Sequence, residues 1–380
     1  MKIDQSILEE NGVEEIVKNG IENKDQVRLV LVFGENKKIA KSDWFEILSS
    51  RYINADIISC SSEDLIVEER VVIDTITFTA IQFDKTKVET SITNIKNHES
   101  SFELGKSVLR SINNEELTGV LIFSDGQLIN GSQLIDGINA VKPKNTIVTG
   151  GLAADGENFS KTLVGINSLP EEGNVVIVGL YGENISIGYG SKGGWDHFGP
   201  KRKVTKSEGN TLYELDNQNA LALYKKYLGD KASELPGAAL FFPIALQIEN
   251  SDEVLIRTIL NIDEENQAMI FAGDIPEGGF VQLMRTNFEH LIDGAREAAV
   301  KSLKSKDNQA VELAILVSCI GRKMVLGQIV DEEIENIMDV FGEETALTGF
   351  YSYGEIAPLS HSKECQLHNE TMTITTLSES

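Results

Sequence analysis

The chain has few cysteines and no long hydrophobic run, and its first residues do not predict a secretory signal. Its 380 residues include three cysteines, which form no C-x-x-C pair: Cys60, Cys319 and Cys365. That pattern argues against a disulfide framework and against a structural zinc site. The longest apolar stretch, at about 238–246, falls far short of the roughly 20 residues that a membrane-spanning helix needs. The opening MKIDQSILEENG is acidic and lacks the apolar core of a secretory signal. These absences predict a cytoplasmic protein that does not bind membranes.

Basic residues are also scarce relative to acidic ones. The chain has 34 Lys and Arg against 59 Asp and Glu, which gives a formal net charge of -25. Such a surface repels phosphate backbones and anionic head groups, so neither nucleic acid nor membrane is predicted as a partner. Acidic runs such as 263–265 lack the D-x-D-x-D-G spacing of a calcium loop, and no metal site is predicted.

The composition that remains is that of a folded, globular protein. Hydrophobic residues make up 41% of the chain and charged residues 24%, which is typical of globular proteins. The length exceeds what one hydrophobic core usually organises, so two domains are expected. A basic, polar segment at 200–210 separates two strand-rich halves. We therefore predict an N-terminal segment at 1–26, a first domain at 27–214 and a second at 215–380.

A strand, helix, strand unit recurs three times along the chain. In each unit a buried-looking strand ends in small or polar residues, an amphipathic helix follows, and a second apolar strand closes the unit. The first strands lie at 28–34, 119–126 and 312–321. Helices of about ten to fifteen residues permit parallel crossovers. The predicted fold class is mixed α/β, with two domains that each hold a mixed sheet flanked by helices and with pseudo-repeated strand, helix, strand units.

Other segments indicate additional antiparallel strands and one long helix. The stretch ITFTAIQF, 76–83, alternates apolar residues with Thr and Gln, which predicts a strand with one solvated face. Apolar residues at helical spacing predict a long helix at about 286–304.

The turns after the parallel strands are the natural place for a ligand, because free backbone N–H groups gather there. Five such turns contain small or polar residues, at 34, 124–126, 150–151, 318–322 and 351–355. If they converge, they form a cleft for a small polar ligand. Arg322 would bind a carboxylate, Glu355 an ammonium group, and tyrosines would form an apolar wall.

Each of these features also has an ordinary structural explanation. The glycines can serve turns, Cys319 can be an inert buried residue, Arg322 and Glu355 can pair with each other, and the tyrosines can be core residues.

Several motifs resemble one known family, and the resemblance spans roughly residues 28–377. SCIGR at 318–322, GFYSYGEI at 349–356, Cys365 and LHNET at 367–371 are similar to the closing signature of the FIST C domain. GVLIFSDG at 119–126, TIVTGGLAAD at 146–155 and GYGSKGGW at 188–195 resemble the FIST N domain. One departure is at 60–64, which reads CSSED where that family usually has a glycine-containing turn.

The resemblance implies a sensory module and not an enzyme. FIST proteins are thought to bind small ligands, with amino acids proposed, and to act in signal transduction through a partner such as a histidine kinase or a cyclase. No cofactor is predicted. The residues expected to bind the ligand are Arg322, Tyr351, Tyr353, Glu355, Asn369, Cys319, Gly150, Gly151, Asp155 and Trp195, with Arg257 as a second cation.

Three other functions stay open at this point. Some proteins that resemble this family are heme-based nitric oxide sensors. Because the chain has no C-x-x-C-H motif, heme would bind noncovalently, with His197 as the candidate axial ligand. Cys319, His368, Glu355 and Asn369 contain the ingredients of a cysteine nucleophile with its base. The third alternative is an interaction scaffold without a ligand.

Overall fold

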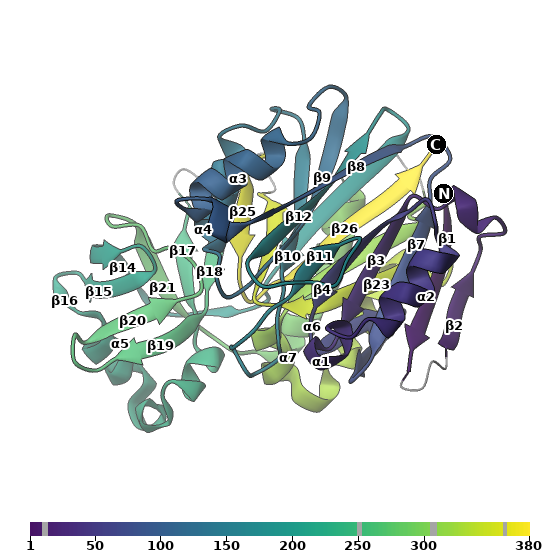
Figure 1. Cartoon of the computed structure of the whole chain (residues 1–380). Coiled ribbons are helices and arrows are strands. Elements are labelled where there is room, and N and C mark those ends of the chain that lie inside the picture. Colours follow the sequence, from purple (N-terminus) through teal and green to yellow (C-terminus); the bar gives the residue numbers. More distant parts are fainter. Residues whose placement is uncertain (10–13, 249–252, 305–309, 360–362) are drawn as a thin grey trace.

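The protein is a mixed α/β structure in which the strands dominate. The computed structural model describes residues 1–9, 14–248, 253–304, 310–359 and 363–380. Within these residues there are three six-stranded sheets and one eight-stranded sheet, flanked by helices (Figure 1). The predicted fold class is confirmed.

The strands fall into four sheets, each described by the spatial order of its strands. Sheet 1 consists of β11 (Val164–Ile166), β4 (Asp56–Ser61), β3 (Leu29–Gly34), β7 (Ile76–Gln82), β1 (Lys2–Leu8) and β2 (Glu14–Asn19). Sheet 2 consists of β25 (Cys365–His368), β24 (Gly354–Pro358), β10 (Ile147–Leu152), β9 (Leu117–Ser124), β12 (Asn174–Tyr181) and β8 (Lys87–Asn94). Sheet 3 consists of β13 (Ile185–Lys192), β26 (Met372–Glu379), β22 (Leu313–Cys319), β23 (Ala346–Ser352), β5 (Asp64–Val67) and β6 (Arg70–Ile73). Sheet 4 consists of β18 (Val254–Arg257), β17 (Ile244–Gln247), β21 (Phe280–Arg285), β14 (Asp196–Glu208), β15 (Thr211–Leu215), β20 (Ala268–Phe271) and β19 (Ile259–Asp263), with β16 (Gln218–Asn219) paired to β15.

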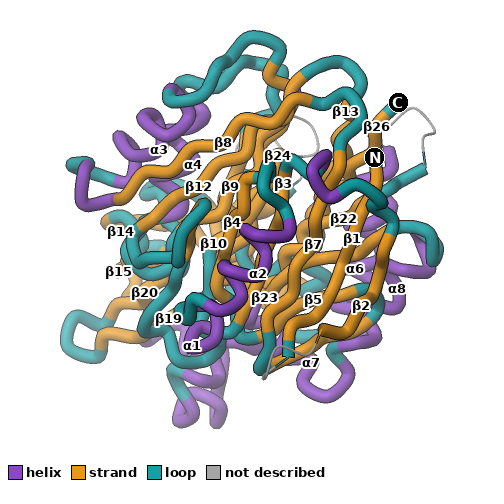
Figure 2. The backbone as a smooth tube through the Cα atoms, turned by 45° about the vertical axis from the view of Figure 1, so that its right-hand side comes forward, coloured by secondary structure: helices purple, strands orange, loops and turns teal. Residues whose placement is uncertain are grey.

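The helices lie outside the sheets (Figures 1 and 2). Their bounds are α1 (Asn36–Ile39), α2 (Asp43–Arg51), α3 (Ser101–Arg110), α4 (Gly131–Asn139), α5 (Ala220–Leu228), α6 (Phe288–Lys304), α7 (Ile320–Leu326) and α8 (Asp331–Phe341). Trp44 and Leu48 of α2 pack in the apolar cluster that also contains Val30 and Val32 of sheet 1. The long helix expected near 286–304 is confirmed as α6.

Each predicted strand, helix, strand unit forms a parallel pair of strands. The pairs are β3 with β4, β9 with β10, and β22 with β23. An antiparallel strand lies on the other side of each first strand: β7, β12 and β26 respectively. Sheets 1, 2 and 3 are therefore built on one plan.

The strand that follows each unit leaves its own sheet and joins another. After unit 1, β5 pairs with β23 of sheet 3. After unit 2, β11 pairs with β4 of sheet 1, and after unit 3, β24 pairs with β10 of sheet 2. The three units thus exchange strands in a cycle, and their sheets enclose one shared core.

Three phenylalanines, one from each unit, meet in that shared core. The ring centroids of Phe33 and Phe350 are 4.8 Å apart, those of Phe33 and Phe123 are 5.9 Å apart, and those of Phe123 and Phe350 are 6.2 Å apart. Aliphatic side chains from all three sheets surround them. The centre of the three units is therefore filled by apolar side chains.

The prediction of a solvated face on β7 is wrong, because every residue of β7 is buried. Thr79 Oγ1 donates to Thr348 Oγ1 of sheet 3 at 2.9 Å and accepts from Gln5 Nε2 at 3.3 Å. The polar face of β7 therefore lies between sheets 1 and 3, where hydroxyl groups satisfy one another.

Sheet 4 and α5 form a smaller body with an apolar cluster of their own (Figure 1). Sheets 2 and 3 contain strands from both sides of the predicted domain boundary at 214/215, and that boundary lies within β15. Residues 1–26 contribute β1 and β2 to sheet 1. None of the described helices is both long enough and apolar enough to cross a bilayer.

Candidate functional site

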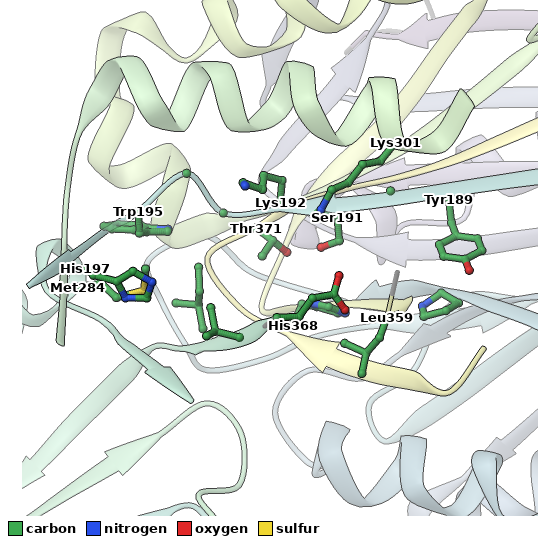
Figure 3. A pocket seen from close by; sticks show the side chains of 17 residues that line it. Tyr189, Ser191, Lys192, Trp195, His197, Met284, Lys301, Leu359, His368 and Thr371 are labelled. Carbon is green, nitrogen blue, oxygen red and sulfur yellow. Dashed lines mark hydrogen bonds between the residues drawn. The ribbon is translucent and has the colours of Figure 1, made fainter. Parts of the chain in front are cut away.

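A cleft of about 630 Å³ lies where sheets 2, 3 and 4 meet. We call it the junction cleft. Its walls come from β13 of sheet 3, from the ends of β24 and β25 of sheet 2, from β14, β18 and β21 of sheet 4, and from α6. The lining side chains labelled in Figure 3 are Tyr189, Ser191, Lys192, Trp195, His197, Met284, Lys301, Leu359, His368 and Thr371.

The lining is polar along the middle of the cleft and more apolar at one end. Trp195 and Met284 lie at one end beside His197, and Tyr189 lies at the other (Figure 3). Ser191 and Thr371 present hydroxyl groups between them. Lys192 and Lys301 supply positive charge and Glu253 supplies negative charge. Lys192 also pairs with Glu297 of α6, with Nζ and Oε2 3.0 Å apart, so the charges along the lining are close to balanced.

A double-glycine turn shapes the wall next to Trp195. Gly194 has φ +85°, and a Cβ there would lie 2.0 Å from the carbonyl oxygen of His290, so only glycine fits. Trp195 is nearly buried, and its Nε1 donates to the carbonyl oxygen of Glu370 at 2.9 Å. This bond joins the GYGSKGGW segment to the LHNET segment.

His368 is a buried, uncharged acceptor at the cleft. Its Nε2 lies 3.1 Å from the carbonyl oxygen of Ala357. A carbonyl can only accept, so Nε2 carries the hydrogen and Nδ1 keeps a lone pair. Burial lowers the pKa of His368 to about 4, which leaves the ring neutral at neutral pH.

Glu355 lies one side chain behind the cleft and is fully buried. Its Oε1 accepts from Ser352 Oγ at 2.8 Å, and its Oε2 accepts from the backbone N–H of Thr371 at 3.2 Å and from Thr371 Oγ1 at 2.9 Å. No cation lies within ion-pair distance of it among the described residues. Burial accordingly raises the pKa of Glu355 to about 8.

The neighbouring residues Asn369 and Glu370 are also fully buried. Glu370 has φ +57°, and its Oε1 accepts from Thr258 Oγ1 at 2.8 Å. Burial raises the pKa of Glu370 to about 7. Glu370 Oε2 and both side-chain polar atoms of Asn369 have no hydrogen-bond partner among the described residues. Unpartnered buried polar atoms are rare in folded proteins and often mark a place that a polar molecule occupies.

Arg322 and Tyr351 lie in a separate buried network and do not line the junction cleft. Arg322 pairs with Glu333, with Nη2 and Oε2 2.8 Å apart, and both side chains are 0% exposed. Tyr351 Oη donates to Glu333 Oε1 at 2.7 Å. Arg322 also donates to the carbonyl oxygens of Gly193 and of Leu291. The guanidinium therefore supports the double-glycine turn from behind.

Four other predicted residues, Gly150, Gly151, Asp155 and Tyr353, lie in β10 or close to its end. Tyr353 Oη donates to Asp155 Oδ1, and the Tyr353 ring stacks on Phe159 at 4.7 Å. Gly150 and Gly151 are buried inside β10, where a Cβ on Gly150 would lie 1.9 Å from the carbonyl oxygen of Ile122. None of these residues lines the junction cleft. A role for them in ligand binding stays a prediction.

Cys319 lies in the interior beside the buried carboxylates. Burial, reinforced by Glu355 and Glu370, raises the pKa of the Cys319 thiol well above its usual range. A thiolate is thus disfavoured there, whereas a cysteine nucleophile needs one.

Of the eleven predicted site residues, the structure places Trp195 on the junction cleft and Arg257 on a second hollow beside it. Four further cleft residues were not predicted to bind the ligand: Ser191, Lys301, Thr371, and His368, which was considered only for the alternative cysteine enzyme. Three of these four sit inside the quoted motifs GYGSKGGW and LHNET, so the motifs contained the signal. Lys301 is on α6 and has no sequence signal of its own.

Comparison with known proteins identifies the family. Residues 28–218 match the FIST N domain and residues 220–358 match the FIST C domain. The chain belongs to the FIST family. FIST domains are sensory domains of signal transduction that are implicated in small-ligand binding.

Relatives add little to this assignment. The chain is 24% identical over 237 residues to the uncharacterized protein MJ1623 of Methanocaldococcus jannaschii, an alignment that covers 58% of this chain and 44% of that one. The chain thus spans less than half the length of that relative. Among solved structures, a cyanuric acid hydrolase from A. caulinodans aligns over 94% of this chain and 91% of its own at 7% identity, with a TM-score of 0.36. A TM-score that low bears on neither the fold nor the activity.

Proposed function

We propose that this FIST protein is a cytoplasmic, non-enzymatic sensor that binds a small metabolite carrying a carboxylate in the junction cleft. An amino acid is the ligand class that we propose first. The main support is that two motif segments distant in sequence, 188–195 and 367–371, line this one cleft, and that the third, 349–356, lies directly behind it. The Trp195 to Glu370 bond and the Thr371 to Glu355 bonds join them.

The size and charge of the cleft support a small anionic or zwitterionic ligand. Small-molecule sites usually measure about 300–1,000 Å³, and the cleft measures about 630 Å³. Lys301 brings a positive charge to the wall beside Ser191, where its Nζ donates to the Ser191 carbonyl oxygen at 3.1 Å. A carboxylate would therefore be drawn to the Lys301 side of the cleft.

The hydrogen-bonding directions of the lining groups suggest how such a ligand is oriented. Thr373 Oγ1 donates to Ser191 Oγ at 3.0 Å, which leaves the Ser191 hydroxyl hydrogen to donate to a carboxylate. Thr371 Oγ1 donates to Glu355 Oε2 at 2.9 Å, which leaves its lone pairs available as acceptors. The lone pair of His368 Nδ1 is a second acceptor. A ligand with a carboxylate at one end and a donor such as an ammonium group at the other fits this polarity.

The walls of the cleft belong to three different sheets, which suggests how binding could be transmitted. A ligand that bridges β13, β25 and β18 would fix sheet 4 relative to sheets 2 and 3. We propose that a separate signalling partner, such as a histidine kinase or a cyclase, detects this change.

The test is a thermal-shift screen with the proteinogenic amino acids and small organic acids, followed by calorimetry on any hit. A ligand at 100 times its dissociation constant should stabilise the protein by about 2.7 kcal/mol. Lys301→Met should abolish the shift, whereas the matched control Lys106→Met, a half-buried lysine of α3 that does not line the cleft, should keep it. If no compound shifts the melting temperature of the folded protein, the proposal fails. A hit that persists in Lys301→Met would move the ligand to another site.

The same screen covers the heme alternative. Heme is added to the purified protein and the spectrum is recorded. A Soret band that His197→Ala removes would favour a heme-based sensor over an amino-acid sensor.

A further inference from the structure

A second and larger hollow lies on the other side of β18 from the junction cleft. This outer groove measures about 1,510 Å³ and runs between α4, β25, β17, β18 and the 274–280 segment of sheet 4. Successive residues of a strand point to opposite faces, and β18 follows this rule: Val254 and Ile256 line the junction cleft, while Leu255 and Arg257 line the outer groove. One strand therefore separates the two hollows.

The floor of the outer groove holds a buried arginine that makes no direct ion pair, although the carboxylates of Asp274 and Asp136 stabilise its charge from beyond ion-pair distance. Arg257 is 4% exposed. Its Nε donates to the carbonyl oxygen of Asp274 at 3.2 Å, and its Nη1 donates to those of Leu367 at 3.0 Å and Ile256 at 3.3 Å. Among the described residues, Nη2 has no hydrogen-bond partner, and no carboxylate lies within 4.0 Å of the guanidinium.

The guanidinium is also fixed in position. A Cβ on Gly273 would lie 2.9 Å from Arg257 Nε, so glycine is what lets the side chain lie there. A buried charge without a directly bonded partner of opposite sign is costly and is retained in few places. A rigid, buried arginine with one donor face open to a groove is built to receive an anion, and a carboxylate fits its planar donor fork.

The rim of the outer groove has the opposite charge. Asp136, Glu277 and Glu364 are exposed along it, and Asp274 is half-buried nearby. Lys201 is the one cation among the described residues of the rim, and its Nζ donates to Gln247 Oε1. An occupant therefore meets positive charge at the floor and negative charge at the entrance.

The walls are apolar and too extended for a metabolite alone. Leu246, Leu255, Ile275 and Leu367 contribute to them, and Phe280 is 49% exposed on one side. The volume exceeds the roughly 1,000 Å³ of the largest usual small-molecule sites. An extended peptide uses such a groove better, because alternate side chains can occupy the apolar walls.

We propose that the outer groove binds the C-terminal end of a partner protein, with its terminal carboxylate on Arg257 Nη2, apolar side chains on the walls and basic side chains at the acidic rim. The overall charge of -25 would attract a basic segment of this kind. This binding does not require that the junction cleft be occupied. It gives the protein a surface for a partner that is separate from its ligand cleft.

The test compares two pools of fluorescein-labelled hexapeptides by fluorescence anisotropy with the full-length protein. Both pools have lysine at the third and fourth positions and Leu, Ile, Val or Phe at the last two. One pool ends in a free carboxylate and the other in a carboxamide. We expect the free-acid pool to bind at least tenfold more tightly. In Arg257→Met that preference should disappear, while Arg202→Met, which removes another arginine of sheet 4 that pairs with Asp216, should retain it.

The outcomes distinguish this proposal from its competitors. Equal binding of the two pools to the wild-type protein, or no binding of either, overturns it without recourse to any variant. A preference that survives in folded Arg257→Met also overturns it. If free leucine or lysine displaces the free-acid pool at the concentrations at which the peptides bind, the outer groove is a metabolite site and not a peptide site. Replacement of both lysines by glutamine should weaken binding and reduce its salt dependence, and unchanged affinity would contradict the role of the acidic rim.

Discussion

Two buried arginines, Arg322 and Arg257, look alike in the sequence and differ in what surrounds them. Arg322 lies inside the three-unit body, fully buried, with Glu333 as its counter-ion. Arg257 lies in sheet 4, almost as deeply buried, and bonds only to carbonyl oxygens. The first arginine is complete without a ligand and the second is not. A counter-ion within the fold therefore separates a structural arginine from a candidate binding residue.

Of the variants considered, Arg322→Met should destabilise the protein most. It leaves Glu333 buried without its cation, and breaking a buried pair in this way costs about 3–5 kcal/mol of unfolding free energy. Urea denaturation measures the loss. The double variant Arg322→Met with Glu333→Gln should recover part of it, because the glutamine still accepts from Tyr351. If Arg322→Met alone is as stable as the wild type, Arg322 is not the structural residue that its ion pair with Glu333 indicates.

Glu355 extends the comparison, since it is a buried carboxylate that lacks a cation. Its pKa is raised from an ordinary value of 4.5 to about 8. Between these values the folded chain holds a proton that the unfolded chain has lost, so stability falls as the pH rises. His368 acts in the opposite direction only below about pH 6.5, because its pKa is lowered.

The measurement for Glu355 is therefore made above that pH. From about pH 6.5 to 8.5, Glu355→Gln should lose about 2 kcal/mol less stability than the wild-type protein does. Urea melts at the two pH values give the difference, and Glu332→Gln, at an exposed position of the same protein, is the control. Identical pH dependence in Glu355→Gln and wild type would show that the side chain is ionised throughout.

Arg257→Met should destabilise the protein less than Arg322→Met does. No carboxylate is left unpaired, and the loss is limited to hydrogen bonds to carbonyl groups, about 1–2 kcal/mol in total. The same denaturation experiment ranks the two variants. If Arg257→Met lowers the unfolding free energy as much as Arg322→Met does, then Arg257 is a structural residue like Arg322.

Ser191→Ala should have the smallest effect on stability and a clear effect on ligand affinity. The hydroxyl lies at the junction cleft, and losing one hydrogen bond to a charged ligand group weakens binding by about tenfold. Calorimetry with the hit from the screen measures the affinity, and the melting temperature of the free protein should change little. A large drop in that temperature with unchanged affinity would place Ser191 among the structural residues.

Much of the fold could be predicted from the sequence because its units are local. The strands around 28–34, 119–126 and 312–321 carry apolar runs that are readable within a short window, and the stripe of α6 is equally local. The exchange of β5, β11 and β24 between units could not be predicted, because the sequence of a strand does not indicate which distant strand it pairs with. Thr79 looked solvated because threonine suits both water and a buried hydroxyl layer.

The candidate site was predictable in its motifs but not in its geometry. Trp195 was predicted and lies on the cleft, while Ser191, His368 and Thr371 lie within the same motifs as the predicted residues Trp195 and Asn369. The side of a strand or turn that faces a hollow depends on register, which a single sequence does not give. Glu333 lies in the first turn of α8, and its burial against Arg322 has no signal in the local sequence.

The cyclic exchange of strands among the three units also constrains how the chain can fold during synthesis. Sheet 1 lacks its β11 edge until residue 166 has been made, and sheet 2 lacks β24 until residue 358. Sheet 3 needs β5 from near the beginning of the chain and β26 from near its end. Such long-range pairings fold slowly and leave strand edges exposed in the meantime. We therefore expect a nascent chain that has not yet reached about residue 379 to depend on chaperones, and the three sheets to close together as one late step.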